Sequence, residues 1–242
     1  MPQRPREFEI GGVYHIINRG VEKRKIFLKN QDYNRFILAL EFLNEKENFH
    51  LWNLVAPAEQ ARPDPATLKK RLDNQRKKPQ HPVVELLAFT LMPNHFHLII
   101  REIREEGIPL FMQKLCSGYV TYFNKQCNRV GPLFQSRYKS VRIKENIHLA
   151  TVFTYVHTNP AELIEPGWKD FHVKNLKATM KYLENYKWSS YQDYIGNSTF
   201  PTVTSREFFL NFYGSKKKCR QALEDWIKYK AAKTELAPNT FE

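Results

Sequence analysis

The sequence predicts an α+β fold of the ferredoxin-like kind, in which one mostly antiparallel sheet carries helices on one face. Two observations support this prediction. Strand and helix patterns follow one another in the order β-α-β, a hairpin strand, α, then β-α. In addition, Pro93-Asn94 interrupts a β-branched and aromatic run at 83–100, which is typical of a β-hairpin. A hydrophobic content of 42% is sufficient for a packed core.

The first part of the chain has the pattern of a strand followed by a helix. The stretch "VYHIINRG" (13–20) reads as a strand that ends at a glycine. The stretch 32–47 predicts a helix with Asp32 as its N-cap, and strand character returns at 48–56. The apolar residues of the predicted helix recur at helical spacing: Phe36, Ala39, Leu40 and Leu43.

The stretch 57–82 is rich in proline and charged residues and poor in large apolar side chains. This composition is typical of a segment that stays outside a packed core. We therefore expect an excursion inserted into the core, with one short helix at 66–77.

Helix and strand patterns resume after the hairpin. The stretch 108–128 repeats apolar residues at helical spacing, which predicts a long helix. A basic, aromatic loop at 131–143 runs into a short strand. The stretch 146–160 predicts a helix that Asn159-Pro160 ends, because the residue before a proline disfavours the α region.

Beyond about residue 165 the chain becomes polar and aromatic, with helical patterns at 205–213 and 216–233. We therefore expect two parts. The first is a core at 8–165 that contains the excursion, and the second is a C-terminal helical extension at 166–242.

The charge of the chain is strongly unbalanced. There are 38 Lys and Arg against 25 Asp and Glu, so the net charge is +13, and the isoelectric point is near 9.6. An excess of this size favours a polyanionic partner, most often nucleic acid and less often an anionic membrane surface.

Cysteine use and hydropathy indicate where the protein works. Cys116, Cys127 and Cys219 are odd in number and show no CxxC spacing, which argues against a disulfide framework and a zinc ribbon. No run approaches the roughly 20 apolar residues of a membrane span, and the N-terminus lacks the apolar core of a signal peptide. We expect a cytoplasmic protein with no membrane partner.

Two histidines stand at the head of an apolar strand, in "LMPNHFHLII" (91–100). Side chains alternate along a strand, so His95 and His97 project together while Phe96 projects the other way. Two neutral imidazoles side by side form half of a metal site. The plain alternative is a pair of ordinary half-buried histidines in a sheet.

The predicted helix at 146–160 carries Tyr155 and Asn159 four residues apart, so they share a face. If this face lies against the histidine strand, the site gathers two imidazoles, a carboxamide oxygen and a phenol. Such a set can hold a divalent cation beside a phosphate and can attack phosphorus through the phenol. Taken alone, Tyr155 could be a core aromatic residue and Asn159 a helix stop.

The stretches "LMPNHFHLII" and "FTYVHTNP" together resemble the IS200/IS605-type single-tyrosine transposases of the HUH nuclease superfamily. The longer branch known as REP-associated tyrosine transposases is the more similar one. The stretches "YHIINRG", "NRVGPLFQSRYKSV" and "KWSSYQDYIG" also resemble segments of that branch. The similarity covers roughly residues 8–196, interrupted by the excursion, for which we find no counterpart.

The resemblance implies a role for each residue that matches a motif. His95 and His97 would be metal ligands, Asn159 the third ligand, and Tyr155 the nucleophile. The reaction implied is cleavage of single-stranded, hairpin-forming DNA to a 5′-phosphotyrosine and a free 3′-hydroxyl, followed by strand transfer. The ion implied is Mg²⁺ or Mn²⁺, and the protein would act as a monomer or homodimer.

A second tyrosine competes for the role of nucleophile. The shorter insertion-sequence enzymes carry a glutamine four residues after the tyrosine, and Tyr122 with Gln126 offers that spacing. We rank Tyr122 second because it belongs to the apolar periodicity of its own helix.

The basic, aromatic loop and its surroundings supply candidate DNA contacts, since a groove that combines cations with aromatic rings suits single strands. The alternative is a solvated basic loop. We expect phosphate contacts from cationic residues and base stacking on two aromatic rings. The candidates are Arg19, Arg129, Arg137, Lys139 and Arg142, with Phe134 and Tyr138 as stacking platforms.

Two other functions fit parts of the same pattern. A domesticated, non-transposing DNA-binding protein could keep the fold and the basic loop. A metal-dependent hydrolase that acts through metal-bound water would need a further Asp, Glu or His ligand near His95 and His97, and would not need Tyr155.

Overall fold

The computed structural model describes residues 7–46, 81–170, 173–197 and 199–236. The strands are β1 (Val13–Arg19), β2 (Val84–Met92), β3 (His95–Glu102) and β4 (Lys139–Ile143). The α-helices are α1 (Asn30–Phe42), α3 (Gly107–Gln126), α4 (Asn146–Thr158), α5 (Leu176–Asn185), α6 (Tyr191–Ile195), α7 (Glu207–Tyr213) and α8 (Lys216–Leu236). Short 3-10 helices include η1 (Val21–Lys23), η3 (Asn159–Leu163) and η4 (Trp168–Asp170).

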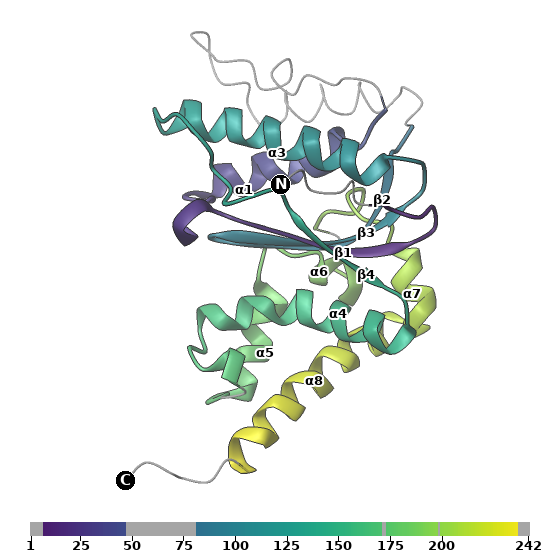
Figure 1. Ribbon diagram of the computed structural model, residues 1–242. Coiled ribbons are helices and arrows are strands. Elements are labelled where there is room, and N and C mark those ends of the chain that lie inside the picture. The colour runs from purple at the N-terminus through teal and green to yellow at the C-terminus, as the bar shows by residue number, and fades with distance from the viewer. Residues whose placement is uncertain (1–6, 47–80, 171–172, 198, 237–242) are drawn as a thin grey trace.

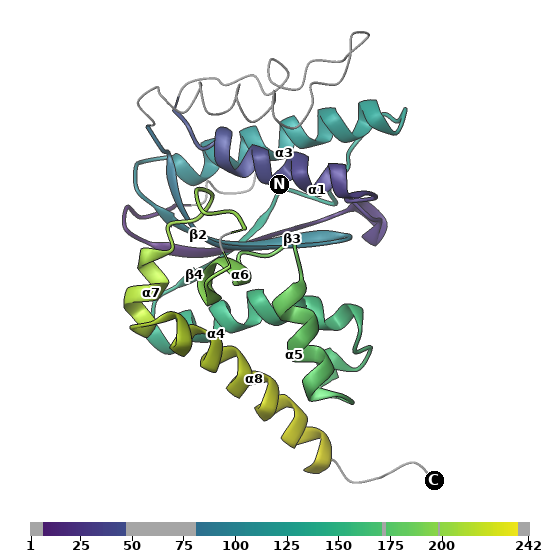
Figure 2. The same ribbon diagram turned by 180° about the vertical axis from the view of Figure 1, so that it is seen from behind.

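The four strands form one antiparallel sheet in the order β2-β3-β1-β4. With α1 between β1 and β2 and α3 between β3 and β4, this is the βαββαβ ferredoxin-like arrangement. The predicted α+β fold is confirmed, with α1 and α3 on one face (Figure 1). The other face is also covered, by α4, α5, α6 and α8, as both views show (Figure 2).

Strand alternation gives the sheet two apolar cores. Phe96 and Leu98 of β3 belong to the core under α1 and α3, whereas Ile99 belongs to the core under α4. Residues from the C-terminal helices, such as Tyr194 and Phe209, complete the second core. The C-terminal helices are therefore built onto the sheet, while a domain boundary at residue 165 stays a prediction.

The outer edge of β2 is closed by a segment of the C-terminal part. The Leu91 N–H donates to the Trp188 carbonyl at 2.8 Å, and the Ser190 N–H donates to the Phe89 carbonyl at 3.0 Å. Because of these bonds, the stretch 188–190 pairs with β2 in the manner of a short additional strand.

Local predictions fail at three points where tertiary contacts decide. Asp32 is not the N-cap: α1 begins at Asn30, and Asp32 accepts hydrogen bonds from the backbone N–H groups of Leu28 and Lys29 at 2.8 and 3.0 Å. The same helix ends at Phe42, short of the expected residue 47. Asn159 keeps α-region angles (φ −53°, ψ −37°) because Pro160 stands in the first turn of η3, where its missing N–H needs no partner.

The other predicted elements are confirmed with small changes of boundary, including the hairpin and the helices that correspond to α3, α7 and α8. The expected strand at 48–56 and helix at 66–77 lie outside the described residues, as does all of the excursion up to residue 80. Among the described helices, none combines the length and apolar character needed to span a membrane.

Candidate active site

The two histidines of β3 lie side by side on the α4 face of the sheet. Their ring centroids are 4.9 Å apart, and both side chains are buried. The intervening Phe96 packs into the opposite core, as strand alternation requires. The prediction that His95 and His97 project together is therefore confirmed.

The end of α4 brings the other two predicted residues to the same place. The Asn159 Oδ1 lies 3.3 Å from the His95 Nε2. The Tyr155 ring stands edge-on to the His97 ring, with centroids 5.3 Å apart and an interplanar angle of 89°. Asn159 is buried, whereas Tyr155 is 39% exposed. A single chain thus gathers the two imidazoles, the carboxamide and an accessible phenol.

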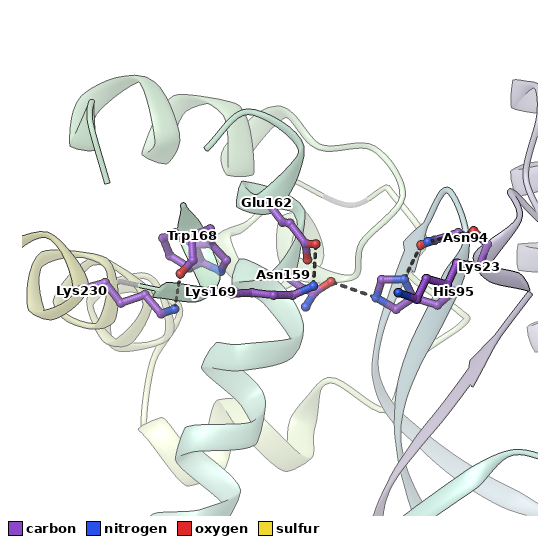
Figure 3. Close-up of polar contacts among 8 residues, drawn as sticks. All are labelled: Lys23, Asn94, His95, Asn159, Glu162, Trp168, Lys169 and Lys230. Atoms are coloured by element: carbon purple, nitrogen blue, oxygen red, sulfur yellow. Dashed lines mark hydrogen bonds and ion pairs between the residues drawn. The ribbon is translucent and has the colours of Figure 1, made fainter. Parts of the chain in front are cut away.

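His95 is held by the turn of the hairpin. The His95 Nδ1 lies 2.6 Å from the Asn94 Oδ1, and the Asn94 Nδ2 donates to the Lys23 carbonyl at 3.3 Å (Figure 3). The bond to Lys23 turns the amide so that its oxygen faces His95, and Nδ1 must then carry the proton. Burial lowers the pKa of His95 to about 4, so at neutral pH the Nε2 that faces Asn159 is an unprotonated acceptor.

His97 presents a buried nitrogen without a partner. Its side chain is 1% exposed, and its Nε2 has no hydrogen-bond partner among the described residues. Its Nδ1 lies 2.9 Å from the Nε2 of His15 on β1. Burial holds the pKa of His97 well below its usual value, so the ring is neutral. An unpaired buried acceptor costs about 1–3 kcal/mol.

These donors fit a divalent cation. The bare Nε2 of His95 faces the Asn159 oxygen, and two acceptors at that distance are stabilised by a cation between them. The unpaired Nε2 of His97 is a third available donor. No cluster of three His, Cys, Asp or Glu side chains suited to a metal occurs in the described part of the chain. Asn159 as a third ligand stays a prediction, and its oxygen lies close enough to His95 for that role.

A lysine and a glutamate from the region after α4 stand beside the phenol. Lys169 on η4 is ion-paired with Glu162 on η3 at 2.6 Å (Figure 3). Both charges act on the pKa of Tyr155. Burial raises the pKa of Tyr155, and the Lys169 ammonium opposes this shift. The turn that bears Lys169 is anchored by α8, because the Lys230 Nζ donates to the Trp168 carbonyl at 2.7 Å.

Arg19 also reaches the site. It ends β1 directly opposite His95 in the antiparallel register, and paired residues share a face of the sheet. Its positive charge acts on the pKa values of His95, His97 and Tyr155, in each case as a secondary cause after burial. The predicted contact of Arg19 with DNA stays a prediction, and the structure places its positive charge at the site.

A comparison with protein families bears on this arrangement. The family model described as "Transposase IS200 like" matches residues 67–159. Over this stretch the chain is similar to IS200-like transposases. The match contains His95, His97 and Tyr155 and ends at Asn159. The predicted resemblance to IS200-like transposases is confirmed.

The other comparisons are less close. A solved structure of a REP-associated tyrosine transposase bound to a REP hairpin has 15% sequence identity and a TM-score of 0.44, and the alignment covers 85% of this chain and 92% of that chain. No curated protein matches the sequence.

The second candidate nucleophile, Tyr122, lies elsewhere. Tyr122 is buried in the core under α1 and α3, and its hydroxyl donates to the Asp32 Oδ1 at 2.9 Å. Burial raises the pKa of Tyr122, and the hydrogen bond to Asp32 adds to this effect. The histidines occupy the opposite face of the sheet, so Tyr122 is separated from the metal-ligand candidates by the sheet itself.

Two of the predicted DNA contacts, Phe134 and Arg142, lie where their surroundings do not favour that role. Phe134 is only 8% exposed and packs edge-on to Phe96, with centroids 5.9 Å apart, so its ring is not available to stack on a base. Arg142 pairs with Tyr14 in the β1–β4 register and forms an ion pair with Glu9. Tyr14 belongs to the core under α1 and α3, so Arg142 lies on the face away from the site.

The remaining candidates differ in their surroundings. Lys139 is exposed and pairs with Ile17, which puts it on the face of the catalytic candidates. Arg137 is exposed in the loop before β4, and Tyr138 is partly buried against the core under α1 and α3. Arg129 donates to the Asn124 Oδ1 at 2.8 Å and to the Pro132 carbonyl at 3.2 Å, which ties it into its own loop.

Four residues near the site were not predicted from the sequence. They are His15, Asn94, Glu162 and Lys169. His15 and Arg19 are four residues apart on one strand and so share a face, which is a signal that could have placed His15 beside the pair. Lys169 left no such signal, because only the packing of η4 against α8 brings it to Tyr155.

The helix that carries Tyr155 is fixed to the sheet through a buried histidine. The His157 Nε2 lies 2.9 Å from the Ser190 Oγ, and the Ser190 Oγ accepts a hydrogen bond from the Phe89 N–H at 2.9 Å. Phe153, one turn earlier, packs in the second core. Burial lowers the pKa of His157 to about 3.

This burial predicts acid sensitivity. The folded-state pKa lies below the unfolded value of 6.5, so the stability linked to neutral His157 is complete above pH 6.5 and is lost as the pH falls toward 3. Between pH 7 and 4.5, the free energy of unfolding should fall by roughly 2 kcal/mol more in the wild type than in His157→Gln. Urea titrations of both proteins at the two pH values measure this difference, and equal losses would contradict it.

Proposed function

We propose that the protein is a single-tyrosine, metal-dependent DNA endonuclease and strand transferase that acts on single-stranded DNA. The main supporting observation is that the Asn159 oxygen lies against His95 and the accessible Tyr155 ring against His97, whose Nε2 is buried without a partner among the described residues. The match of residues 67–159 to the IS200-like transposases supports the DNA-processing class.

Tyr155 would act as the nucleophile. Its Oη attacks the phosphorus, an Oη–P bond forms and the P–O3′ bond breaks, leaving a 5′-phosphotyrosine and a 3′-hydroxyl. The phenol proton is released, and the departing 3′-oxygen takes up a proton. Because burial raises the pKa of Tyr155, the phenol is protonated in the free protein, and the Lys169 ammonium favours its ionised form. Attack by a 3′-hydroxyl on the phosphotyrosine rejoins the strand.

His95 Nε2, His97 Nε2 and Asn159 Oδ1 would hold Mg²⁺ or Mn²⁺. When bound, the ion supplies positive charge to a non-bridging phosphate oxygen. Nitrogen ligands favour Mn²⁺ over Mg²⁺. Burial of the two imidazoles keeps them neutral. Contacts with Asn94 and His15 fix the orientation of the His95 and His97 rings.

The substrate would be hairpin-bearing single-stranded DNA, in the cytoplasm. The net charge of +13 suits a polyanion, and Arg19 and Lys169 supply cations at the site itself. The solved relative bound to a REP hairpin suggests the hairpin as the first substrate to try. Because one chain contributes all four groups, a monomer has the residues needed for one cleavage.

The direct test is incubation with end-labelled, hairpin-bearing single-stranded DNA and Mn²⁺, followed by a denaturing gel. A metal-dependent covalent protein–DNA adduct is the expected result. Tight DNA binding with no adduct under any metal would instead indicate the domesticated DNA-binding protein. Cleavage without an adduct would indicate a hydrolase that uses metal-bound water.

β4 offers a matched test of the DNA path, because successive residues of a strand face opposite sides. Lys139→Gln removes a charge on the site face, and Arg142→Gln removes one on the other face. In Lys139→Gln, the slope of log affinity against log salt should fall by about 0.7, the value of one phosphate contact on a single strand. In Arg142→Gln the slope should be unchanged. Filter binding across a salt series measures both, and the reverse pattern would move the DNA path to the other face.

A further inference from the structure

His15 lies directly behind His97. Its Nε2 is 2.9 Å from the His97 Nδ1, and the two ring planes are nearly parallel, at 17°, with centroids 5.1 Å apart. The Tyr155 ring stands edge-on to His15, with centroids 6.0 Å apart. His15 comes from β1, opposite Ile99, so the antiparallel pairing of β1 with β3 fixes its position relative to His97.

Two neutral imidazoles in this arrangement share one hydrogen. Two ring nitrogens 2.9 Å apart need one hydrogen between them, because two bare lone pairs or two N–H groups would repel each other. Either the His97 Nδ1–H donates to the His15 Nε2, or the His15 Nε2–H donates to the His97 Nδ1. In the first case the His97 Nε2 is bare. In the second case it carries the proton and cannot bind a cation.

Only the first arrangement gives the unpaired Nε2 of His97 a chemical role. A neutral imidazole has one N–H, and in the second arrangement that N–H would be buried at Nε2 with no acceptor among the described residues. In the first arrangement the same position holds a lone pair, which a cation can use. Histidine ligands commonly have their other ring nitrogen fixed by a hydrogen bond of this kind.

We propose that His15 is a positioning residue for the metal site: its Nε2 accepts the hydrogen bond of His97 Nδ1–H and thereby holds His97 in the tautomer and orientation that expose Nε2 to a divalent cation. This inference rests on the proposed function, and it adds a residue that touches neither the metal nor the nucleophile's target.

Two substitutions separate this role from simple packing. His15→Leu fills the space without an acceptor, whereas His15→Gln places an amide oxygen that can accept from His97. His148, whose charge also acts on His15, provides the control, because His148→Gln removes a neighbouring imidazole without touching the His97 Nδ1 contact. All variants are made in the full chain, and thermal melts show whether each one folds.

The readout is Mn²⁺ affinity without DNA, from electron paramagnetic resonance of the free ion. His15→Leu should bind Mn²⁺ about 10–100-fold more weakly than wild type, the usual effect of removing a ligand's hydrogen-bond partner. His15→Gln should recover most of the affinity, and His148→Gln should match wild type. Wild-type affinity in folded His15→Leu would overturn the inference alone. Absence of Mn²⁺ binding by the wild type would overturn the metal part of the proposed function, and the inference with it.

A second measurement does not depend on any variant. Long-range ¹H–¹⁵N spectra of the histidine rings in the metal-free wild type should show His97 protonated on Nδ1 and bare on Nε2. A proton on Nε2 of His97, with His15 as the donor, would overturn the inference.

Discussion

Tyr155→Phe is expected to abolish the covalent protein–DNA adduct while leaving DNA binding and stability almost unchanged. The substitution removes one hydroxyl from a side chain that is 39% exposed, and the ring can keep its edge-on contact with His97. Loss of a covalent nucleophile typically lowers the rate by about 10⁴-fold or more. Adduct yield on a denaturing gel and affinity by filter binding measure the two effects.

Tyr122→Phe is the matched control. It also removes one phenolic hydroxyl, but this one is buried and donates to Asp32 on the far face of the sheet. We expect a loss of about 1 kcal/mol in stability and normal adduct formation. Mass spectrometry of the nuclease-trimmed adduct should place the nucleotide on the peptide containing Tyr155. A nucleotide on the peptide containing Tyr122 would overturn the assignment.

His97→Ala is expected to remove metal-dependent cleavage. The metal supplies several kcal/mol of transition-state stabilisation, which corresponds to about 10³-fold in rate. The pairing of β3 with β1 and β2 uses backbone groups, so the sheet should persist. Single-turnover cleavage at saturating Mn²⁺ measures the loss, and His95→Ala should behave in the same way.

The control for this substitution is His157→Gln. His157 is also a buried histidine on the α4 face, but its partner is Ser190 rather than the site. The His157→Gln variant should retain Mn²⁺-dependent cleavage above pH 6.5. Cleavage at the wild-type rate by His97→Ala in the presence of EDTA would refute the metal site.

The parts of the fold and site that follow from local pattern were predictable. Alternation along one strand places His95 and His97 together, and helical spacing places Tyr155 and Asn159 together. Pro93-Asn94 between two apolar runs marks the hairpin. Each of these relations is set within a few residues of the chain, so the sequence contains the whole signal.

The remaining features depend on pairing between distant segments. Phe134 is buried because its stretch bridges to Gly20, and Arg142 turns away from the site because of the register of β4 against β1. A register cannot be read from one strand alone, although a shift of one residue would reverse both outcomes. For the same reason Lys169 became visible only once η4 was placed, and the contact of His15 with His97 depends on the pairing of β1 with β3.

The anchoring of α4 has a consequence for how strands could be exchanged. Phe153 and His157 hold the helix in the second core and against the sheet, so its tyrosine is carried by an anchored element. Under the proposed chemistry, a DNA end joined to Tyr155 would stay where it was cut instead of being carried to another location. The incoming 3′-hydroxyl would therefore have to travel to the stationary end, and the order of DNA arrival and departure would govern the product.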